Sequence, residues 1–231
     1  MKILAIIPAR GGSKRLPRKN ILELCGKPLI QWTIDAVLGC DEIDTVMVST
    51  DCYEIAKIAK NSGAEVPFLR NAELSSDTAS SADVVMDVIS YYSLQDKEFD
   101  AILLLQPTSP LRTKDDIFNA IKLYKNKLAT SVVSVTECDH SPLWCNILTD
   151  DLNMDSFIDD DIKKLRSQDL PIYYRINGAI YLVDIKDFCT NKSFMPKGTY
   201  SLIMSRENSI DIDNKLDFQY AELILKNNND E

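Results

Sequence analysis

Residues 3–14 read Ile-Leu-Ala-Ile-Ile-Pro-Ala-Arg-Gly-Gly-Ser-Lys, an uninterrupted apolar run followed at once by turn residues and cations. A short apolar run bounded by turn residues is typical of a buried strand. Similar runs occur at 45–50, 101–106 and 131–135, and they alternate with stretches of helical period. We therefore predict an α/β fold in which βα units surround a parallel sheet.

The length and composition fit one α/β domain, or such a domain with a small insertion. The chain has 231 residues, 45% of them apolar, which is enough to form a substantial core. No apolar run approaches the roughly 18 residues that span a bilayer, and the segment after Met1 lacks the features of a secretory signal. We expect a cytoplasmic protein that has no membrane partner.

Five cations and no acid lie within residues 10–20, although the whole chain carries a net charge of −9. The Gly11-Gly12 pair lets backbone N–H groups approach a ligand closely, and a loop after the first strand of such a sheet lies where ligands bind. We predict that this loop binds a small polyanion such as a triphosphate. The alternative is a solvated basic loop. The acidic balance of the chain argues against a nucleic-acid partner.

Helical spacing predicts helices that begin near Pro28, near Val84 and at Thr113, where Asp116 completes a capping-box sequence. A last helix follows Asp213-Asn214, and either of these two residues could cap it.

The regular alternation stops between about 137 and 175, where aspartates and aromatic residues accumulate. We interpret this segment as an insertion. Its aspartates are expected to be a solvated surface rather than a calcium loop, whereas its aromatics favour a contact surface such as a dimer arm.

Asp211-Ile212-Asp213 places two carboxylates two residues apart, so an extended backbone would project both from one face. This geometry can hold Mg²⁺, although surface strands and helix caps also produce the pattern. The chain has a single histidine, His140, and its six cysteines form no C-x-x-C pair. Neither a metal finger nor a hydrolase triad is therefore predicted.

Two amides are candidate contacts for a hydroxyl or carboxylate group. Gln106 would emerge where the strand at 101–106 ends, and Asn177-Gly178 would start another apolar strand. An amide both donates and accepts hydrogen bonds, so each residue could bind a substrate or merely satisfy neighbouring backbone groups.

Together, several blocks in this order resemble the N-acylneuraminate cytidylyltransferases, also called CMP-sialic acid synthetases, along nearly the whole chain. The blocks are Ile7–Lys14, Lys19-Asn20, Ser49-Thr50-Asp51, Leu105–Arg112, Asn177–Tyr181 and Asp211-Ile212-Asp213. The resemblance implies a Rossmann-like, three-layer αβα fold with a mostly parallel sheet, as a single nucleotidyltransferase domain over 1–231. It further implies a homodimer with an inserted dimerisation arm at about 137–175. The implied reaction is Mg²⁺-dependent transfer of CMP from CTP to a nine-carbon 2-keto sugar acid, with release of pyrophosphate.

The resemblance also implies roles for individual residues. Arg10, Lys19 and Asp211 would be catalytic, and Asp211 with Asp213 would hold Mg²⁺. The nucleotide contacts would be Ala9, Arg10, Ser13, Lys19, Asn20, Arg70, Ala79 and Ser81. The sugar acid would lie among Gln106, Arg166, Asn177 and Phe194.

Two positions depart from the sialate-specific pattern. Trp144 stands where such enzymes often have a lysine in the dimer arm, which resembles enzymes for legionaminic acid, and Arg15 replaces a common glycine. The alternative substrates are pseudaminic acid and the eight-carbon KDO. A non-catalytic CTP-binding sensor is the alternative from another functional class.

Overall fold

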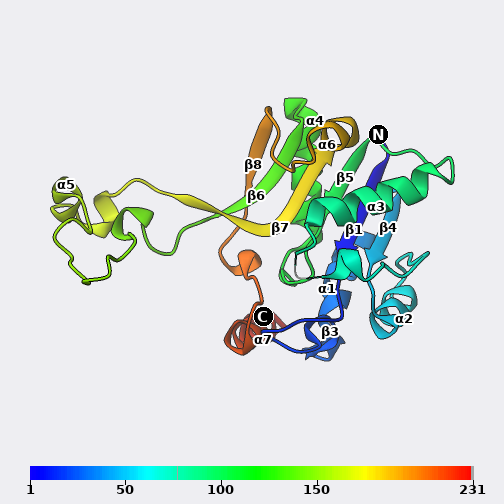
Figure 1. Cartoon of the computed structure of the whole chain (residues 1–231), viewed down its shortest axis with the longest axis horizontal. Helices are drawn as coiled ribbons and strands as arrows, with labels where there is room; N and C mark the ends of the chain where they lie inside the picture. The colour runs from blue at the N-terminus through cyan, green and yellow to red at the C-terminus, as the bar shows by residue number, and fades with distance from the viewer. Residues whose placement is uncertain (77, 230–231) are drawn as a thin grey trace.

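The computed structural model describes residues 1–76 and 78–229. Within them, six strands form one sheet in the order β4-β1-β5-β7-β6-β8, and all of these except β7 run in the same direction (Figure 1). The strands are β1 (Ile3–Pro8), β4 (Thr45–Ser49), β5 (Ala101–Leu104), β6 (Ser131–Glu137), β7 (Tyr174–Asp184) and β8 (Thr199–Ile203). A small antiparallel pair consists of β2 (Glu23–Leu24) and β3 (Lys27–Pro28). The predicted α/β fold with a mostly parallel sheet is confirmed.

Helices cover both faces of the sheet. The helices in the described part of the chain are α1 (Leu29–Leu38), α2 (Tyr53–Asn61), α3 (Ser81–Ser93), α4 (Lys114–Lys127), α5 (Asp160–Lys163), α6 (Ile185–Asn191) and α7 (Lys215–Asn229), of which α5 and α7 lie away from the sheet faces. Single 3₁₀ turns occur at Lys19–Ile21, Glu73–Ser75, Pro142–Trp144, Ser167–Asp169 and Glu207–Ser209. Helices α1, α2 and α4 pack on one face and α3 and α6 on the other, which gives the three-layer arrangement.

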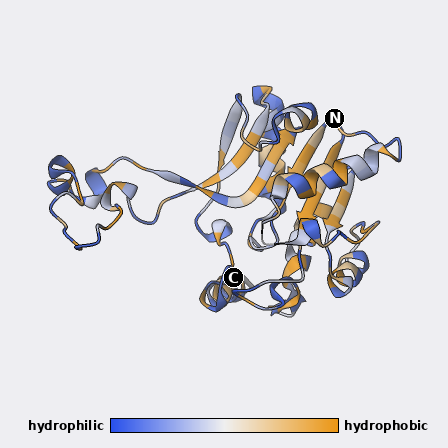
Figure 2. Cartoon of the chain, in the orientation of Figure 1, coloured by the Kyte–Doolittle hydropathy of each residue, from blue (hydrophilic) through white to orange (hydrophobic). Residues whose placement is uncertain are grey.

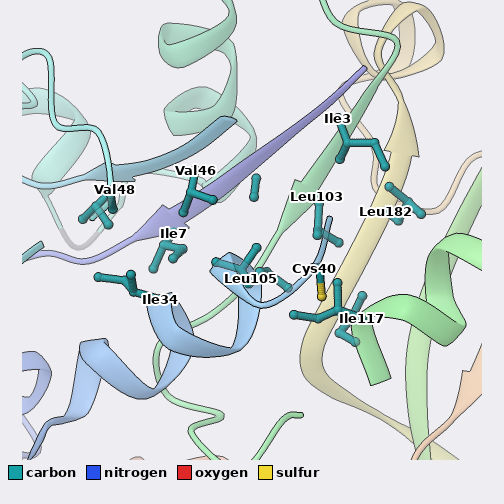
Figure 3. Packing of buried hydrophobic residues seen from close by; sticks show 14 of the residues in the cluster. Ile3, Ile7, Ile34, Cys40, Val46, Val48, Leu103, Leu105, Ile117 and Leu182 are labelled. Carbon is teal, nitrogen blue, oxygen red and sulfur yellow. The ribbon is translucent and has the colours of Figure 1, made fainter. Parts of the chain in front are cut away.

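Strand β1 shows why its sequence is apolar throughout. Ile3 and Ile7 belong to the core under α1, α2 and α4, whereas Leu4 and Ile6 belong to the core under α3 and α6. Successive side chains of a strand point to opposite faces, so a strand covered on both sides has no polar alternation. Figure 3 shows the first of these cores, and Figure 2 shows the apolar residues concentrated in the sheet.

The helices begin at or close to the residues that the sequence predicts. Thr113 and Asp116 form the predicted capping box at the start of α4. Asn214 caps α7, because its Oδ1 accepts from the backbone N–H groups of Leu216 and Asp217. Pro28 directly precedes α1 instead of lying in its first turn.

Two strand boundaries differ from the sequence prediction. Strand β5 ends at Leu104, so Gln106 lies in the following loop. Asn177-Gly178 does not start a strand but lies inside β7, at a register shift against β6. The prediction missed Tyr174–Ile176 because these strand residues are largely exposed and therefore lack the apolar pattern of a core strand.

The segment between β6 and β7, residues 138–173, projects away from the sheet as an arm that carries α5 (Figure 1). Several of its apolar side chains are exposed, including Ile147 at 90%, Leu152 at 67% and Ile172 at 64%. None of the helices in the described part of the chain combines the length and the apolar character needed to cross a membrane.

Candidate active site

The basic loop after β1 is held by its backbone from several sides. The Ala9 N–H donates to the Ser49 carbonyl at 2.9 Å, and the Gly11 N–H donates to Asp51 Oδ1 at 2.8 Å. Asn20 Nδ2 donates to the Arg10 carbonyl at 2.9 Å. The loop is therefore anchored to β4 and to its own far end, at the carboxyl edge of the sheet where ligands bind in α/β proteins.

A first cavity of about 310 Å³ lies beside this loop, which is the size range of small-molecule sites. Apart from Ala9, all of the predicted nucleotide contacts line it, and Ala9 is buried beside Pro8. The lining residues are Pro8, Arg10, Ser13, Lys19, Asn20, Arg70, Leu74, Ser76, Ala79, Ser81, Val84, Gln106, Pro107 and Thr108. The structure thus brings together residues from three separate stretches of the chain, 8–20, 70–84 and 106–108, whereas their role in nucleotide binding stays a prediction.

The cations of this cavity are held in place. The Lys19 side chain is 12% exposed, and its Nζ donates to the Ile212 carbonyl at 2.5 Å and lies 3.4 Å from Asp213 Oδ1. Arg70 is 6% exposed, and its Nε donates to Ser75 Oγ at 3.2 Å. Burial lowers the pKa of Arg70, and the Asp51 carboxylate acts in the opposite direction. Cations that are fixed before a polyanion binds lose little entropy on binding it.

Asp211 and Asp213 flank the buried Ile212, with Asp211 exposed and Asp213 half-buried. The Asp213 carboxylate accepts from Arg15 Nη1 at 2.6 Å. The pKa of Asp211 is raised, first by burial and further by Asp213, whereas hydrogen bonding from Thr108 and the Lys19 charge act to lower it.

These two carboxylates fit a magnesium ion. Within residues 1–76 and 78–229 no cluster of three or more histidine, cysteine or acidic side chains is placed to hold a metal. Mg²⁺ in phosphate-transfer sites commonly takes one or two carboxylates and completes its shell with water and substrate phosphates. Asp211 and Asp213 next to a basic cavity are such a donor set.

A second cavity, also of about 310 Å³, adjoins the first, because Ser81 and Gln106 line both. Its lining residues are Ser81, Leu104, Gln106, Tyr181, Lys192, Ser193, Phe194 and Met195. The pKa of Tyr181 is raised by burial and by the charge of Asp211. Asp211 lines neither cavity, but Thr108 of the first cavity hydrogen-bonds to its carboxylate and its charge acts on Tyr181 of the second.

Gln106 is positioned by two residues that do not themselves line either cavity. The guanidinium of Arg112, a residue that is 2% exposed, donates from Nη1 to the carbonyls of Gln106 at 3.2 Å and Ala179 at 2.9 Å. Burial lowers the pKa of Arg112 to about 10. Gly178 has φ +76°, and a Cβ there would lie 3.0 Å from Gln106 Oε1. Arg112 therefore holds the loop that separates the two cavities, and Gly178 leaves the space that the Gln106 side chain occupies.

The residues predicted around the sugar acid divide into two groups. Gln106 and Phe194 line the second cavity, where Phe194 packs against Tyr181 and Phe188 with ring centroids 5.4 and 4.8 Å apart. Asn177 and Arg166 are not brought to it in this chain.

Asn177 is 2% exposed and is used within the fold, since its Nδ2 donates to Ser209 Oγ at 2.8 Å and its Oδ1 accepts from Ser134 Oγ at 2.6 Å. Arg166 lies on the arm and is exposed. Sequence reasoning missed Thr108, Tyr181 and Lys192. The first two stand inside motifs that had been noted for other residues, whereas Lys192 carries no local signal.

A basic cavity at the carboxyl ends of parallel strands, an adjoining mixed cavity and a pair of carboxylates are features expected of a nucleotide-dependent α/β transferase. The family described as "Cytidylyltransferase" matches residues 4–220, and the chain belongs to this family.

Curated relatives agree over the full length of the chain. It is 40% identical to a CMP-N,N'-diacetyllegionaminic acid synthase of Legionella pneumophila, over 99% of this chain and 98% of that protein. It is 38% identical to an N-acylneuraminate cytidylyltransferase of Escherichia coli, over 99% of this chain but 53% of that longer protein. It is 34% identical to a pseudaminic acid cytidylyltransferase of Campylobacter jejuni, over 100% of this chain and 99% of that protein.

Solved structures share the fold. A CMP:2-keto-3-deoxy-manno-octonic acid synthetase complexed with CTP aligns with a TM-score of 0.71 at 19% identity, over 99% of this chain and 100% of that one. A 4-diphosphocytidyl-2C-methyl-D-erythritol synthase from Anaerococcus prevotii aligns with a TM-score of 0.58 at 15% identity, over 97% of this chain and 98% of that one. The Rossmann-like character of the sheet and its helices is thereby confirmed.

Proposed function

We propose that this cytidylyltransferase transfers CMP from CTP to a nine-carbon 2-keto sugar acid of the N-acylneuraminate or legionaminate type, with release of pyrophosphate. The observation that carries the proposal is the pair of adjoining cavities, one basic and one of mixed character, that meet at Ser81 and Gln106. The full-length identity to a legionaminic acid enzyme supports the choice of acid.

The first cavity would take CTP. Lys19, Arg10 and Arg70 surround it with positive charge and would neutralise the charge that grows on the triphosphate as it is cleaved. Positioning and electrostatic stabilisation supply most of the acceleration in phosphoryl transfer, so the enzyme needs no nucleophilic side chain of its own.

The second cavity would take the sugar acid. Its anomeric hydroxyl oxygen forms a bond to the α-phosphorus of CTP, the bond from that phosphorus to the bridging oxygen breaks, and pyrophosphate leaves with the electron pair. The hydroxyl proton passes to the Asp211 carboxylate.

Asp211 and Asp213 would hold Mg²⁺. When bound, the ion supplies positive charge to the phosphates. In the absence of substrate, Arg15 and Lys19 balance the charge of Asp213.

We also propose that two chains associate through the arm. Its exposed apolar residues, among them Ile147, Leu152 and Ile172, would be buried against a second copy. Arg166 on this arm could then meet an acid bound to the partner. Light scattering on the purified protein is expected to give the mass of two chains, and a monomer at micromolar concentration would contradict the proposal. We place the reaction in the cytoplasm, where CTP is available.

The function is tested by pyrophosphate release from CTP with N-acetylneuraminic, N,N'-diacetyllegionaminic, pseudaminic or KDO acid in parallel, with and without EDTA. We expect metal-dependent release with one of the first two acids, and the highest rate with the legionaminic acid. A preference for pseudaminic acid or KDO would contradict the assigned acid. CTP binding without release with any acid would contradict the transfer reaction and favour a CTP sensor.

A further inference from the structure

Asp51 lies outside the first cavity, yet it contacts the loop that forms one wall. It follows β4 by two residues, at the turn into α2. Its Oδ1 accepts from the Gly11 N–H at 2.8 Å, and the bond is partly buried. Asp51 is absent from the residues that line the cavity, so it would act on a bound nucleotide only through other groups.

The contact depends on a close approach of two backbones. A Cβ at Gly11 would lie 3.0 Å from the Cβ of Cys52, a separation that real side chains reach only if something shifts. Two residues earlier, the Ala9 N–H donates to the Ser49 carbonyl at 2.9 Å and holds the start of the same loop. The basic loop therefore rests directly on the turn that contains Asp51.

Asp51 also acts on a second cation that lines the cavity, Arg70. Arg70 is 6% exposed, and its own N–H donates to the Thr50 carbonyl at 2.8 Å. Burial lowers the pKa of Arg70, Asp51 raises it, and the charge of Arg10 lowers it again. Two guanidinium groups thus lie within electrostatic range of each other, and the Asp51 carboxylate offsets part of their repulsion and of the cost of burying Arg70.

We propose that Asp51 is a positioning residue for the nucleotide: it fixes the Gly11 loop and steadies Arg70 so that both are in place before the triphosphate arrives. The inference rests on the proposed function in that the nucleotide is CTP. A preformed site binds its ligand without first ordering its own loops. The role predicts an effect on CTP binding and none on the affinity for the sugar acid.

The structure offers a matched control at the other end of the same strand. Asp44 Oδ2 accepts from the Ile3 N–H at 2.7 Å, also in a partly buried bond between the start of β4 and the start of β1. Asp44 and Asp51 make the same type of bond on the two ends of one strand pair, but Asp51 alone is next to the basic loop. Asp44→Ala is therefore expected to lower stability and to leave CTP binding unchanged.

The test is calorimetric titration of CTP into the wild-type protein and the variants without acid, followed by steady-state kinetics. We expect Asp51→Ala to weaken CTP binding and to raise the KM for CTP about tenfold, the loss typical of one hydrogen bond to a charged group. The KM for the acid should stay within twofold. Asp51→Asn keeps an oxygen for the Gly11 N–H but lacks the charge, and its affinity for CTP should be about threefold lower than that of the wild type. Gly11→Ala should resemble Asp51→Ala because it displaces the same loop.

The possible failures are distinguishable. CTP affinity of Asp51→Ala within twofold of wild type would overturn the positioning role and leave the proposed function intact. An equal loss of CTP affinity in Asp44→Ala would overturn it as well, because the effect would then follow from general destabilisation. Absence of CTP binding by the wild-type protein would overturn the proposed function together with the inference.

Discussion

The two cavities differ in how deeply several of their polar lining residues are buried. The first is lined by groups tied into the core, such as Asn20 and Arg70, which are 7% and 6% exposed. The second includes the exposed Lys192 and Met195, in the short connection between α6 and β8. In a transferase that joins one nucleotide to one of several acids, the cavity with the more buried lining would serve the constant substrate and the more exposed one would set specificity.

A substitution at Asp211 should have the largest effect on turnover. Asp211→Asn is expected to lower kcat at least 100-fold, since the variant loses the proposed base and a proposed metal ligand, each of which contributes on this scale. The protein should be no less stable than wild type, because the ionised carboxylate is disfavoured by burial and by Asp213. Single-turnover kinetics and thermal unfolding measure both effects, and unchanged turnover would remove Asp211 from the mechanism.

In the first cavity, Lys19→Ala should lower kcat by roughly 100-fold, which is typical for the loss of one group that stabilises transition-state charge. Arg18 provides the control, since it belongs to the same basic loop but pairs with Glu54 at 2.7 Å and does not line the cavity. Arg18→Ala should keep near-normal turnover. If the two variants behaved alike in steady-state assays, general loop charge rather than Lys19 would be responsible.

The junction at Gln106 should give a smaller and mixed effect. Gly178→Ala combines a positive φ with a contact of 3.0 Å to Gln106 Oε1, whereas Gly26→Ala has φ +79° and open space around the new Cβ. Both should lose about 1–2 kcal/mol of unfolding free energy in urea titrations, because the positive φ disfavours alanine. An increase in the KM for either substrate is expected in Gly178→Ala alone. An equal increase in Gly26→Ala would contradict a positioning role for Gly178.

A substitution in the second cavity should have the smallest effect on the kinetics. Among the described residues that line the second cavity, Lys192 is the cation, and it has φ +50° at the end of α6. Lys192→Asn suits this backbone, because asparagine tolerates a positive φ. We expect the KM for the acid to rise severalfold while the KM for CTP and the melting temperature stay constant. Lys197→Ala, a nearby exposed change outside the lining, should alter none of these.

The sequence predicts the surroundings of the first cavity better than those of the second. The apolar run of β1, the basic loop and the Thr113 capping box are local patterns, and each encodes its own structure. The Asp211-Ile212-Asp213 pattern is also local, and Ile212 is buried between the two acids, whereas their role as metal ligands stays a prediction.

The second cavity had no such signal. It forms where β5, β7 and the connection after α6 meet, and only the tertiary structure brings Leu104, Tyr181 and Lys192 together. Asn177 shows why the two interpretations of an amide stayed open, since a buried amide that hydrogen-bonds to Ser134 and Ser209 has the same sequence signature as an amide that binds a substrate.

The central claim is that the acid in the second cavity attacks the α-phosphorus of the nucleotide in the first. It is tested most directly by ³¹P NMR of the reaction between CTP, Mg²⁺ and N,N'-diacetyllegionaminic acid labelled with ¹⁸O at its anomeric hydroxyl. The account predicts pyrophosphate and a CMP-sugar whose phosphorus resonance carries the isotope shift of a bridging ¹⁸O. A CMP-sugar without the label in the bridge, or hydrolysis of CTP without a sugar product, would contradict it.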